Sequence, residues 1–179
     1  MKTTKKGFTL IELIVVIAII GVLAAILVPS MLGYVRKSKI SSANSTAASI
    51  YKAINSGLTE LDEEGVDIGA TGVLSITAES HTCSFAATDL SSVANGSDGL
   101  GSKIQKFFND IDRVKGDTYA YIEGGTCVAL GVSTDATYTG TYPTGIINSD
   151  NYDDYKGANG AKAAVTAALA KLGYSVTIQ

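Results

Sequence analysis

The chain has 179 residues, of which 46% are hydrophobic and 17% are charged, and its formal net charge is -3. This length accommodates one domain with its own hydrophobic core besides a terminal extension, but not two domains. The negative net charge argues against a nucleic-acid-binding surface, because phosphate contacts need clustered Lys and Arg side chains.

A long apolar segment at the start of the chain is the first predicted element. Residues 8–28 contain a single charged side chain, that of Glu12. They are long enough to cross a bilayer, which takes about 20 residues of helix. A carboxylate inside a membrane span costs roughly 3 kcal/mol on insertion scales, so such a residue usually has a partner and a function. Glu12 is therefore the first candidate functional residue.

Two interpretations of this segment follow from its composition alone. A secretory signal peptide would begin with the basic residues Lys2, Lys5 and Lys6 and would be cleaved near Val22-Leu-Ala-Ala25. The apolar region of such a peptide is shorter than this one, and it carries no acid. A plain single-span anchor accounts for the length but not for Glu12 or for the Gly-Phe junction.

A third interpretation comes from a family resemblance. The motif Lys5-Lys-Gly-Phe-Thr-Leu-Ile-Glu-Leu, followed by the apolar run, resembles the amino terminus of type IV prepilins and of their pseudopilin relatives. The resemblance implies that residues 1–7 are a leader peptide, which a prepilin peptidase removes by cutting between Gly7 and Phe8. It also implies that the new terminal residue, Phe8, is N-methylated.

The resemblance further implies a role in assembly for Glu12. In a fibre core without water, an unpaired carboxylate is costly, whereas an ion pair of good geometry is tolerated. We therefore expect Glu12 of one subunit to pair with the terminal amine of Phe8 in another. Gly21 and Pro29 are the expected positions for a bend or local unwinding of the helix.

An amphipathic continuation of the helix is predicted over residues 29–61. Its apolar residues recur at spacings of three or four, which places them on one helix face: Ile40, Ala43, Ala47, Ile50, Ile54, Leu58 and Leu61. A helix from Phe8 to Leu61 would be about 80 Å long at 1.5 Å per residue. Gly65 is the predicted stop.

Residues 62–179 are predicted to form the globular head. The predicted elements are a strand at 73–77, a helix at 100–111, a hairpin of 118–123 with 126–132 around Gly124-Gly125, a loop at 133–160, a helix at 161–172 and a strand at 174–178. The expected fold class is α+β and pilin-like, with one long N-terminal helix packed on a small antiparallel sheet.

The two cysteines, Cys83 and Cys127, both lie in this head. In an exported domain, an oxidised pair is the expected state, and it would close a loop of about 45 residues. The alternative is two buried free thiols. His81 lies close to Cys83, but no second pair of ligands accompanies them, so a metal site is not predicted.

No catalytic site is predicted. His81 is the only histidine available to a catalytic triad. The stretch Gly96-Ser-Asp-Gly-Leu-Gly101 lacks the Lys-Ser/Thr ending of a phosphate-binding loop, and Asp150-Asn-Tyr-Asp-Asp154 lacks the glycine and the distal glutamate of a calcium-binding EF-hand. The sequence therefore predicts a protein that is not an enzyme and needs no cofactor or metal.

These observations favour a structural subunit of a type IV pilus. The resemblance implies a single-pass precursor in the cytoplasmic membrane and then a surface filament, with other copies of the subunit, an assembly ATPase and a platform membrane protein as partners. A pseudopilin of a type II secretion or competence system is the first alternative. A membrane-tethered binding module whose anchor is never processed is the second.

Overall fold

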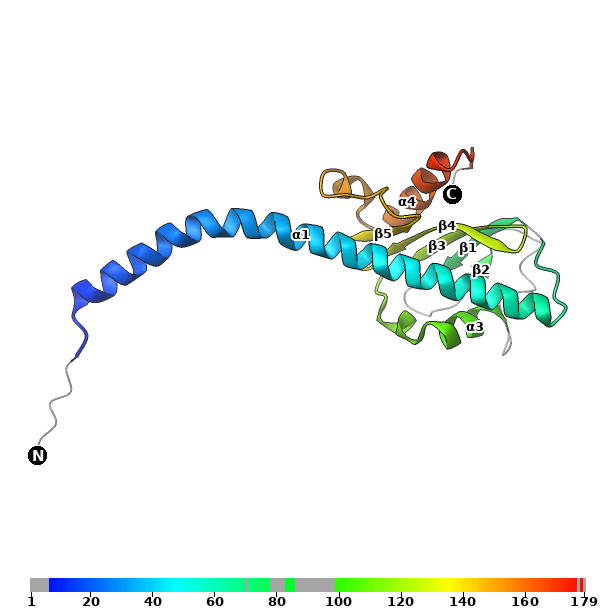
Figure 1. Ribbon diagram of the computed structural model, residues 1–179, viewed down its shortest axis with the longest axis horizontal. Helices are drawn as coiled ribbons and strands as arrows, with labels where there is room; N and C mark the ends of the chain where they lie inside the picture. The colour runs from blue at the N-terminus through cyan, green and yellow to red at the C-terminus, as the bar shows by residue number, and fades with distance from the viewer. Residues whose placement is uncertain (1–6, 70, 78–82, 86–98, 177, 179) are drawn as a thin grey trace, which may run out of the picture. The chain divides into compact units, whose positions relative to one another are not determined.

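The structure is a computed structural model that describes residues 7–69, 71–77, 99–176 and 178, and the backbone of residues 83–85. The chain divides into two compact units, Met1–Arg36 and Lys37–Gln179, and the long helix α1 contributes to both. The elements in chain order are α1 (Leu10–Glu63), β1 (Gly72–Ile76), β2 (Cys83–Phe85), α3 (Leu100–Phe107), the 3-10 helix η1 (Asn109–Arg113), β3 (Thr118–Glu123), β4 (Thr126–Ser133), β5 (Thr139–Tyr142), the 3-10 helix η2 (Tyr152–Tyr155) and α4 (Gly160–Lys171) (Figure 1).

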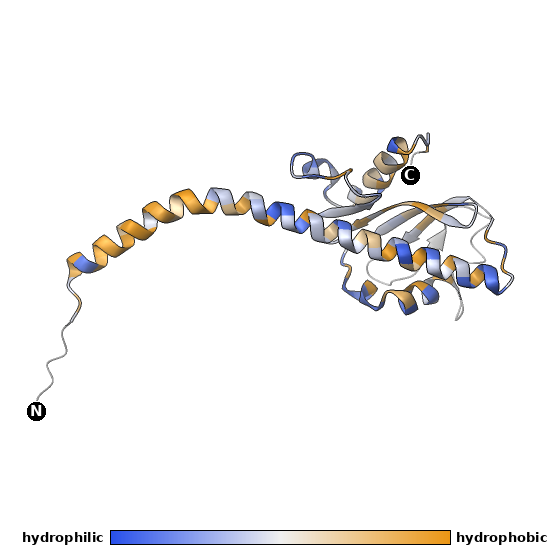
Figure 2. Ribbon diagram, in the orientation of Figure 1, coloured by the Kyte–Doolittle hydropathy of each residue, from blue (hydrophilic) through white to orange (hydrophobic). Residues whose placement is uncertain are grey.

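The first unit consists mainly of the apolar half of α1. Its large side chains are exposed in the single chain, from Phe8 at 88% to Val35 at 43%. Figure 2 shows this half of the helix as almost uniformly hydrophobic. By length and composition, α1 is the one helix among the described residues that is able to cross a membrane. The predicted apolar helix is confirmed.

The part of α1 in the second unit is amphipathic, as predicted. Its buried residues repeat at helical spacing: Ile40, Ala43, Ala47, Ile50, Ala53, Ile54, Gly57, Leu58 and Leu61. The helix ends in a Schellman motif, in which the N–H of Gly65 donates to Asp62 O and that of Val66 donates to Leu61 O. Gly65 adopts a φ of 80°, a conformation that residues with a side chain disfavour. The helix stop predicted at Gly65 is confirmed.

The sheet of the second unit is antiparallel and has five strands in the order β2-β1-β3-β4-β5. The predicted β3–β4 hairpin is present, and its turn residues Gly124 and Gly125 both have positive φ, as a two-residue hairpin turn requires. Between Tyr121 and Ile122 the register shifts, because β4 carries one extra residue there, Val128.

Helices cover both faces of this sheet. On one face, α1 and α3 enclose the main core with alternate strand residues such as Ile122 and Leu130. On the other face, α4 packs through Val165 and Leu169 against Tyr121 and Ala129 (Figure 1). Successive side chains of the strands therefore point into two separate cores. The head has three layers: α1 with α3, the sheet, and α4.

Strand β5 lies against α1 at very short range. A Cβ on Gly140 would overlap the carbonyl group of Ala43, so only glycine fits there. Next to it, the side-chain oxygen of Asn44 accepts a hydrogen bond from the N–H of Thr141 at 2.9 Å. This contact joins segments 97 residues apart in the sequence.

Three predicted elements of the head need correction. The helix predicted over 100–111 ends at Phe107, and Ile111 lies in η1 instead. The loop predicted over 133–160 contains β5 and η2. Residues 174–176, predicted as part of a final strand, pair with no strand. Their alternation has another cause, since Tyr174, Val176 and Ile178 pack onto the core beneath α4.

Candidate functional site

The predicted cleavage point lies directly before α1. Gly7, Phe8 and Thr9 are outside the helix, and all three are exposed. A Cβ built on Gly7 would meet nothing within 4 Å, so the chain itself does not require glycine at this position. A requirement for glycine here would therefore come from an enzyme that binds this peptide.

Thr9 and Glu12 form a capping box at the start of α1. The N–H of Thr9 donates to Glu12 Oε2 at 2.8 Å, and the Thr9 hydroxyl donates to the same oxygen at 2.6 Å. In return, the N–H of Glu12 donates to Thr9 Oγ1 at 3.4 Å. This reciprocal pattern satisfies two amides that an α-helix leaves without partners at its N-terminus.

The capping box gives Glu12 a role that the charge argument alone did not identify. A carboxylate in the first turn also interacts favourably with the positive end of the helix dipole. The signal was present in the sequence, since Thr9-Leu-Ile-Glu12 has the Ser/Thr-x-x-Glu spacing of a capping box. Both bonds from Thr9 end on Oε2, and a carboxylate has further lone pairs on its second oxygen.

Gly21 and Pro29 lie within the continuous helix α1. Nothing would contact a Cβ on Gly21 within 4 Å, and Pro29 cannot donate the usual hydrogen bond to the preceding turn. Next to it, the Ser30 hydroxyl donates to Leu27 O at 3.0 Å. The helix does not break at either residue in the single chain, and unwinding in a fibre stays a prediction.

The two cysteines lie on strands that are not neighbours. Cys83 is in β2 and Cys127 is in β4, with β1 and β3 between them. Three strand spacings amount to about 14 Å. The Cα atoms of a disulfide are rarely more than about 7 Å apart. The strand order argues against the predicted disulfide and favours the alternative of two thiols.

The environment of Cys127 is described in full, whereas the side chain of Cys83 and the whole of His81 lie outside the described residues. Cys127 is completely buried, and its Sγ lies 3.7 Å from Ala129 O. Burial raises the pKa of this thiol far above its ordinary value, which makes it unreactive.

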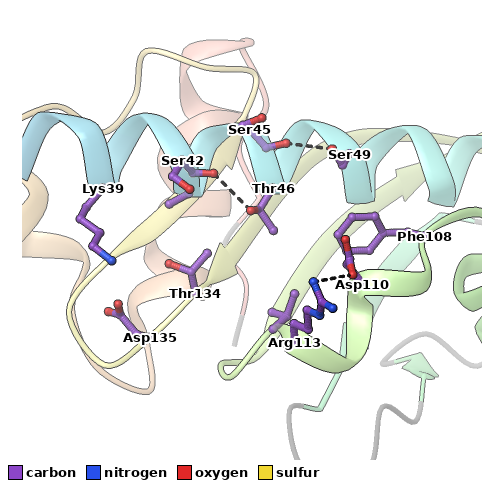
Figure 3. Close-up of a pocket in the computed structure, with 12 residues that line it drawn as sticks. Lys39, Ser42, Ser45, Thr46, Ser49, Phe108, Asp110, Arg113, Thr134 and Asp135 are labelled. Carbon is purple, nitrogen blue, oxygen red and sulfur yellow. Dashed lines mark hydrogen bonds and ion pairs between the residues drawn. The ribbon is translucent and has the colours of Figure 1, made fainter.

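A polar hollow of about 400 Å³ lies beside α1 in the second unit (Figure 3). Two of its hydroxyl groups donate hydrogen bonds to carbonyl oxygens one turn back in α1: Thr46 Oγ1 to Ser42 O and Ser49 Oγ to Ser45 O. Arg113 pairs with Asp110 at 3.3 Å. These bonds satisfy the polar groups of Thr46, Ser49 and Arg113 within the protein.

An ion-pair cluster joins α3 to the end of α1. The nearly buried Lys103 ammonium group lies 2.6 Å from Glu64 Oε1 and 3.4 Å from Glu60 Oε1, and Lys106 lies 2.9 Å from Glu60 Oε1. The hydrogen bond to Glu64 is the main cause that raises the pKa of Lys103. The hydrogen bond from Lys106 is the main cause that lowers the pKa of Glu60.

Metal-ligand clusters are absent from the part of the chain that the structure describes. In the acidic loop at Asp150, the side chains of Asn148 and Asn151 accept hydrogen bonds from the loop's own backbone. The Asp153 carboxylate pairs with Lys156. These contacts organise the loop.

Comparisons with known proteins point to the N-terminal segment. A family model described as the prokaryotic N-terminal methylation motif matches residues 2–28. The type IV major fimbrial protein FimA of Dichelobacter nodosus is 44% identical over 73 residues, which are 40% of this chain and 47% of the relative. The type IV major pilin protein PilA of Myxococcus xanthus is 46% identical over 57 residues, or 32% of this chain and 26% of the relative.

A longer match extends into the head. The fimbrial protein of Moraxella nonliquefaciens is 37% identical over 121 residues, which are 65% of this chain and 76% of the relative. The match to FimA, by contrast, spans about half the length of that protein. No solved structure matches the chain significantly. The methylation motif, the long helix α1 on its antiparallel sheet, and a fimbrial relative that shares 76% of its length with this chain establish that it belongs to the type IV pilin family.

Proposed function

We propose that the chain is a structural subunit of a type IV pilus, which polymerises through α1 into a surface fibre. The observation that carries this proposal is the segment from Gly7 to Val28. It combines an exposed Gly-Phe junction, a helix N-terminus that is capped by the carboxylate of Glu12, and an apolar helix whose side chains are exposed in the single chain.

The exposed apolar half of α1 must be shielded from water both before assembly and in the fibre. Side chains such as Ile11, Ile19 and Ile26 are 56–71% exposed, and an uncovered apolar helix surface is unstable in water. Before assembly, the bilayer provides the cover, and the protein is a single-pass precursor in the cytoplasmic membrane. In the fibre, the same half of the helix in other copies provides it.

Processing supplies the cation that Glu12 needs. A prepilin peptidase cuts between Gly7 and Phe8 and methylates the new terminus, which leaves a positively charged amine. The Thr9 bonds keep one carboxylate oxygen of Glu12 on its own helix, and the other oxygen accepts the Phe8 amine of a second subunit. An assembly ATPase and a platform membrane protein supply the energy and the site for extraction from the membrane.

Variants at Thr9 and Glu12 separate the capping role from the charge. Glu12→Gln keeps an acceptor for the capping box but removes the charge, whereas Thr9→Ala removes the capping hydroxyl and keeps the charge. Glu12→Ala removes both. Loss of a cap costs about 0.5–2 kcal/mol of helix stability, which a helix of this length tolerates. We expect cleavage in all three variants, and sheared surface fibres from Thr9→Ala alone.

The measurement is an immunoblot of the sheared surface fraction, with the cleaved chain in the membrane fraction as the reference. Fibres from Glu12→Gln at the wild-type level would contradict the charge pairing. Absence of the wild-type chain from the sheared fraction would contradict the pilus assignment itself.

A further inference from the structure

The dipeptide Asn159-Gly160 at the start of α4 is a chemically reactive feature of the head. Asn-Gly occurs twice in the chain, and the other occurrence, Asn95-Gly96, lies outside the described residues. In a flexible chain, the glycine nitrogen attacks the side-chain carbonyl carbon of the asparagine, because glycine has no Cβ to hinder the approach. A carbon–nitrogen bond forms, the side-chain amide leaves with the backbone proton as ammonia, and a five-membered succinimide results.

Water then opens the succinimide at one of its two carbonyl carbons. One opening gives an ordinary aspartate, and the other gives isoaspartate, in which the main chain runs through the side chain and is one carbon longer. In both cases an amide and a water molecule become a carboxylate and ammonium. The reaction needs no enzyme, so at a given pH and temperature the conformation of the dipeptide sets its rate.

The conformation of Asn159 keeps the reacting atoms apart. Its ψ is 0°, so the nitrogen of Gly160 eclipses the backbone nitrogen of Asn159. Ring closure requires the Gly160 nitrogen to lie on the side of Cβ instead, which is a rotation of about one third of a turn, because Cα is tetrahedral. That rotation would turn the Asn159 carbonyl group away from the N–H of Ala163, whose hydrogen bond it accepts at 3.0 Å.

The surroundings of Gly160 oppose the same rotation. Gly160 is buried, and a Cβ on it would overlap the carbonyl group of Tyr155 in η2. The hydroxyl of Thr139 donates to Tyr155 O at 2.6 Å and so holds this carbonyl group in place. The attacking nitrogen is itself engaged, since the N–H of Gly160 donates to Gly157 O at 3.0 Å. Gly160 is therefore held between η2 and the first turn of α4.

The side chain of Asn159 is not restrained in this way. Asn is a favoured residue at a helix N-cap because its side chain accepts a backbone N–H. Asn159 occupies the N-cap of α4, but it is exposed and makes no capping hydrogen bond. Its amide is therefore accessible to water, and the main chain alone restrains the reaction.

We propose that Asn159-Gly160 is a latent site of spontaneous deamidation, which the docking of α4 on the sheet holds in check. The reaction proceeds only after the start of α4 has detached. Isoaspartate then prevents redocking, because the lengthened main chain would press Gly160 against Tyr155 O, where one more carbon atom does not fit. Isoaspartate at residue 159 thus marks chains in which α4 has opened. This inference concerns the head alone and does not depend on assembly into a fibre.

A comparison of reaction rates tests the proposal without any variant. Trypsin cleaves after Lys156 and Lys162 and releases residues 157–162 as one hexapeptide. The full-length chain in detergent, the same chain in urea and a synthetic hexapeptide of this sequence are incubated in one mildly alkaline buffer. Mass spectrometry after chromatographic separation of aspartate from isoaspartate gives each rate.

We expect the native chain to react slower than the synthetic hexapeptide by about tenfold or more, because only the locally opened form reacts. The chain in urea should react at the rate of the hexapeptide. Equal rates in the native chain and the hexapeptide would overturn the proposal, and so would a slow reaction in urea, since the restraint would then not come from the fold.

Two variants connect the rate to a particular contact. Thr139→Val replaces the hydroxyl that holds Tyr155 O with a methyl group, and we expect deamidation to accelerate by about threefold or more. Thr144→Val, at an exposed position in the neighbouring loop, is the matched control and should react at the wild-type rate. A wild-type rate for Thr139→Val, or equal acceleration in both variants, would overturn the role of Tyr155.

The Asn159→Asp variant separates the two products. It carries the ordinary aspartate from the start, and a carboxylate at a helix N-terminus is favourable, so α4 should stay docked. Hydrogen exchange should then show protected α4 amides in Asn159→Asp and unprotected ones in chains that carry isoaspartate. Equal protection of α4 in both would overturn the claim that isoaspartate prevents redocking.

Discussion

Glu12 caps the start of α1, and we propose that it also pairs with the terminal amine of a second subunit. As the third residue of α1, it accepts the N–H of Thr9 and closes the helix. As an acid in an apolar segment, it is costly to keep in a membrane unless a cation reaches it. The capping bonds hold the carboxylate near the helix terminus, which is where the cleaved amine of a second subunit would arrive. The position of the charge is therefore set by the helix start rather than by the membrane.

Cys127 is the residue whose chemistry the structure changes most. Burial keeps its thiol neutral, so we expect the native chain to leave Cys127 unlabelled by iodoacetamide at about pH 8. Because the pKa of the thiol is raised in the folded state, its contribution to stability is present below the ordinary thiol pKa and is lost as the pH rises above about 9. Peptide mass spectrometry after labelling measures the fraction of Cys127 that iodoacetamide has modified.

The same labelling tests the strand order. In the denatured chain without reductant, both cysteines should take up label, because β1 and β3 separate Cys83 from Cys127. Label on neither cysteine, and label on both after reduction, would show that the disulfide exists and that β2 lies elsewhere.

At the scale of elements, α1 is attached to the sheet by two asparagines. The side-chain oxygen of Asn44 accepts the N–H of Thr141 in β5, and that of Asn55 accepts the N–H of Cys127 in β4 at 3.0 Å. Apolar packing alone does not specify a helix position along a sheet, whereas these two bonds do. The donors lie 72 and 97 residues from these asparagines in the sequence, so both bonds depend on the tertiary fold.

Asn55→Ala should therefore destabilise the head. It leaves the buried N–H of Cys127 without its acceptor, and we expect the free energy of unfolding to fall by about 1–3 kcal/mol. Asn55→Asp keeps an acceptor and should cost less. Ser56→Ala, at an exposed neighbouring position, should change the stability by less than about 0.5 kcal/mol. Near-ultraviolet circular dichroism of the tyrosines during urea unfolding measures all three, and equal costs for Asn55→Ala and Ser56→Ala would contradict this role.

The ion-pair cluster that joins α3 to α1 predicts that the stability of the head depends on pH in the acidic range. The bonds from Lys106 and Lys103 hold the pKa of Glu60 below its ordinary value of 4.5, so this stabilisation is present above pH 4.5 and is lost as the pH falls through the lowered pKa. We expect the stability of the wild-type chain to fall more steeply between about pH 5 and 3 than that of Glu60→Gln. Glu63→Gln, a neighbour outside the cluster, should keep the wild-type slope; equal slopes in all three would contradict the assignment.

Local pattern predicted most of these elements but not all of them. The spacing of apolar residues predicted α1 and α4, and Gly124-Gly125 predicted the hairpin, because each signal lies within a few residues. Strand β5 was missed because its stability comes from Asn44 and from the close approach of Gly140 to α1, which are distant in sequence. The alternation of Tyr174, Val176 and Ile178 predicts a strand, but these side chains instead pack in the cluster that contains Val165 and Leu169 of α4.

At the scale of the whole molecule, the sequence motif predicted the family and the position of the site, whereas the structure supplied the contacts within it. The Gly7-Phe8 junction and Glu12 were identified from the motif and its resemblance. The spacing of Thr9 and Glu12 is sufficient to predict the capping box, whereas the expected compartment of the head predicts a disulfide against which the strand order argues. A helix on each sheet face was not predictable, since nothing local says which face α4 covers.

The central claim is that the chain is processed at Gly7 and polymerised through α1. Intact-mass spectrometry of the chain in sheared surface fibres tests this most directly. The account predicts a chain that begins at Phe8, carries one added methyl group on that residue and lacks Met1 to Gly7. A surface-exposed chain that retains Met1 to Gly7, or fibres without this chain, would contradict it.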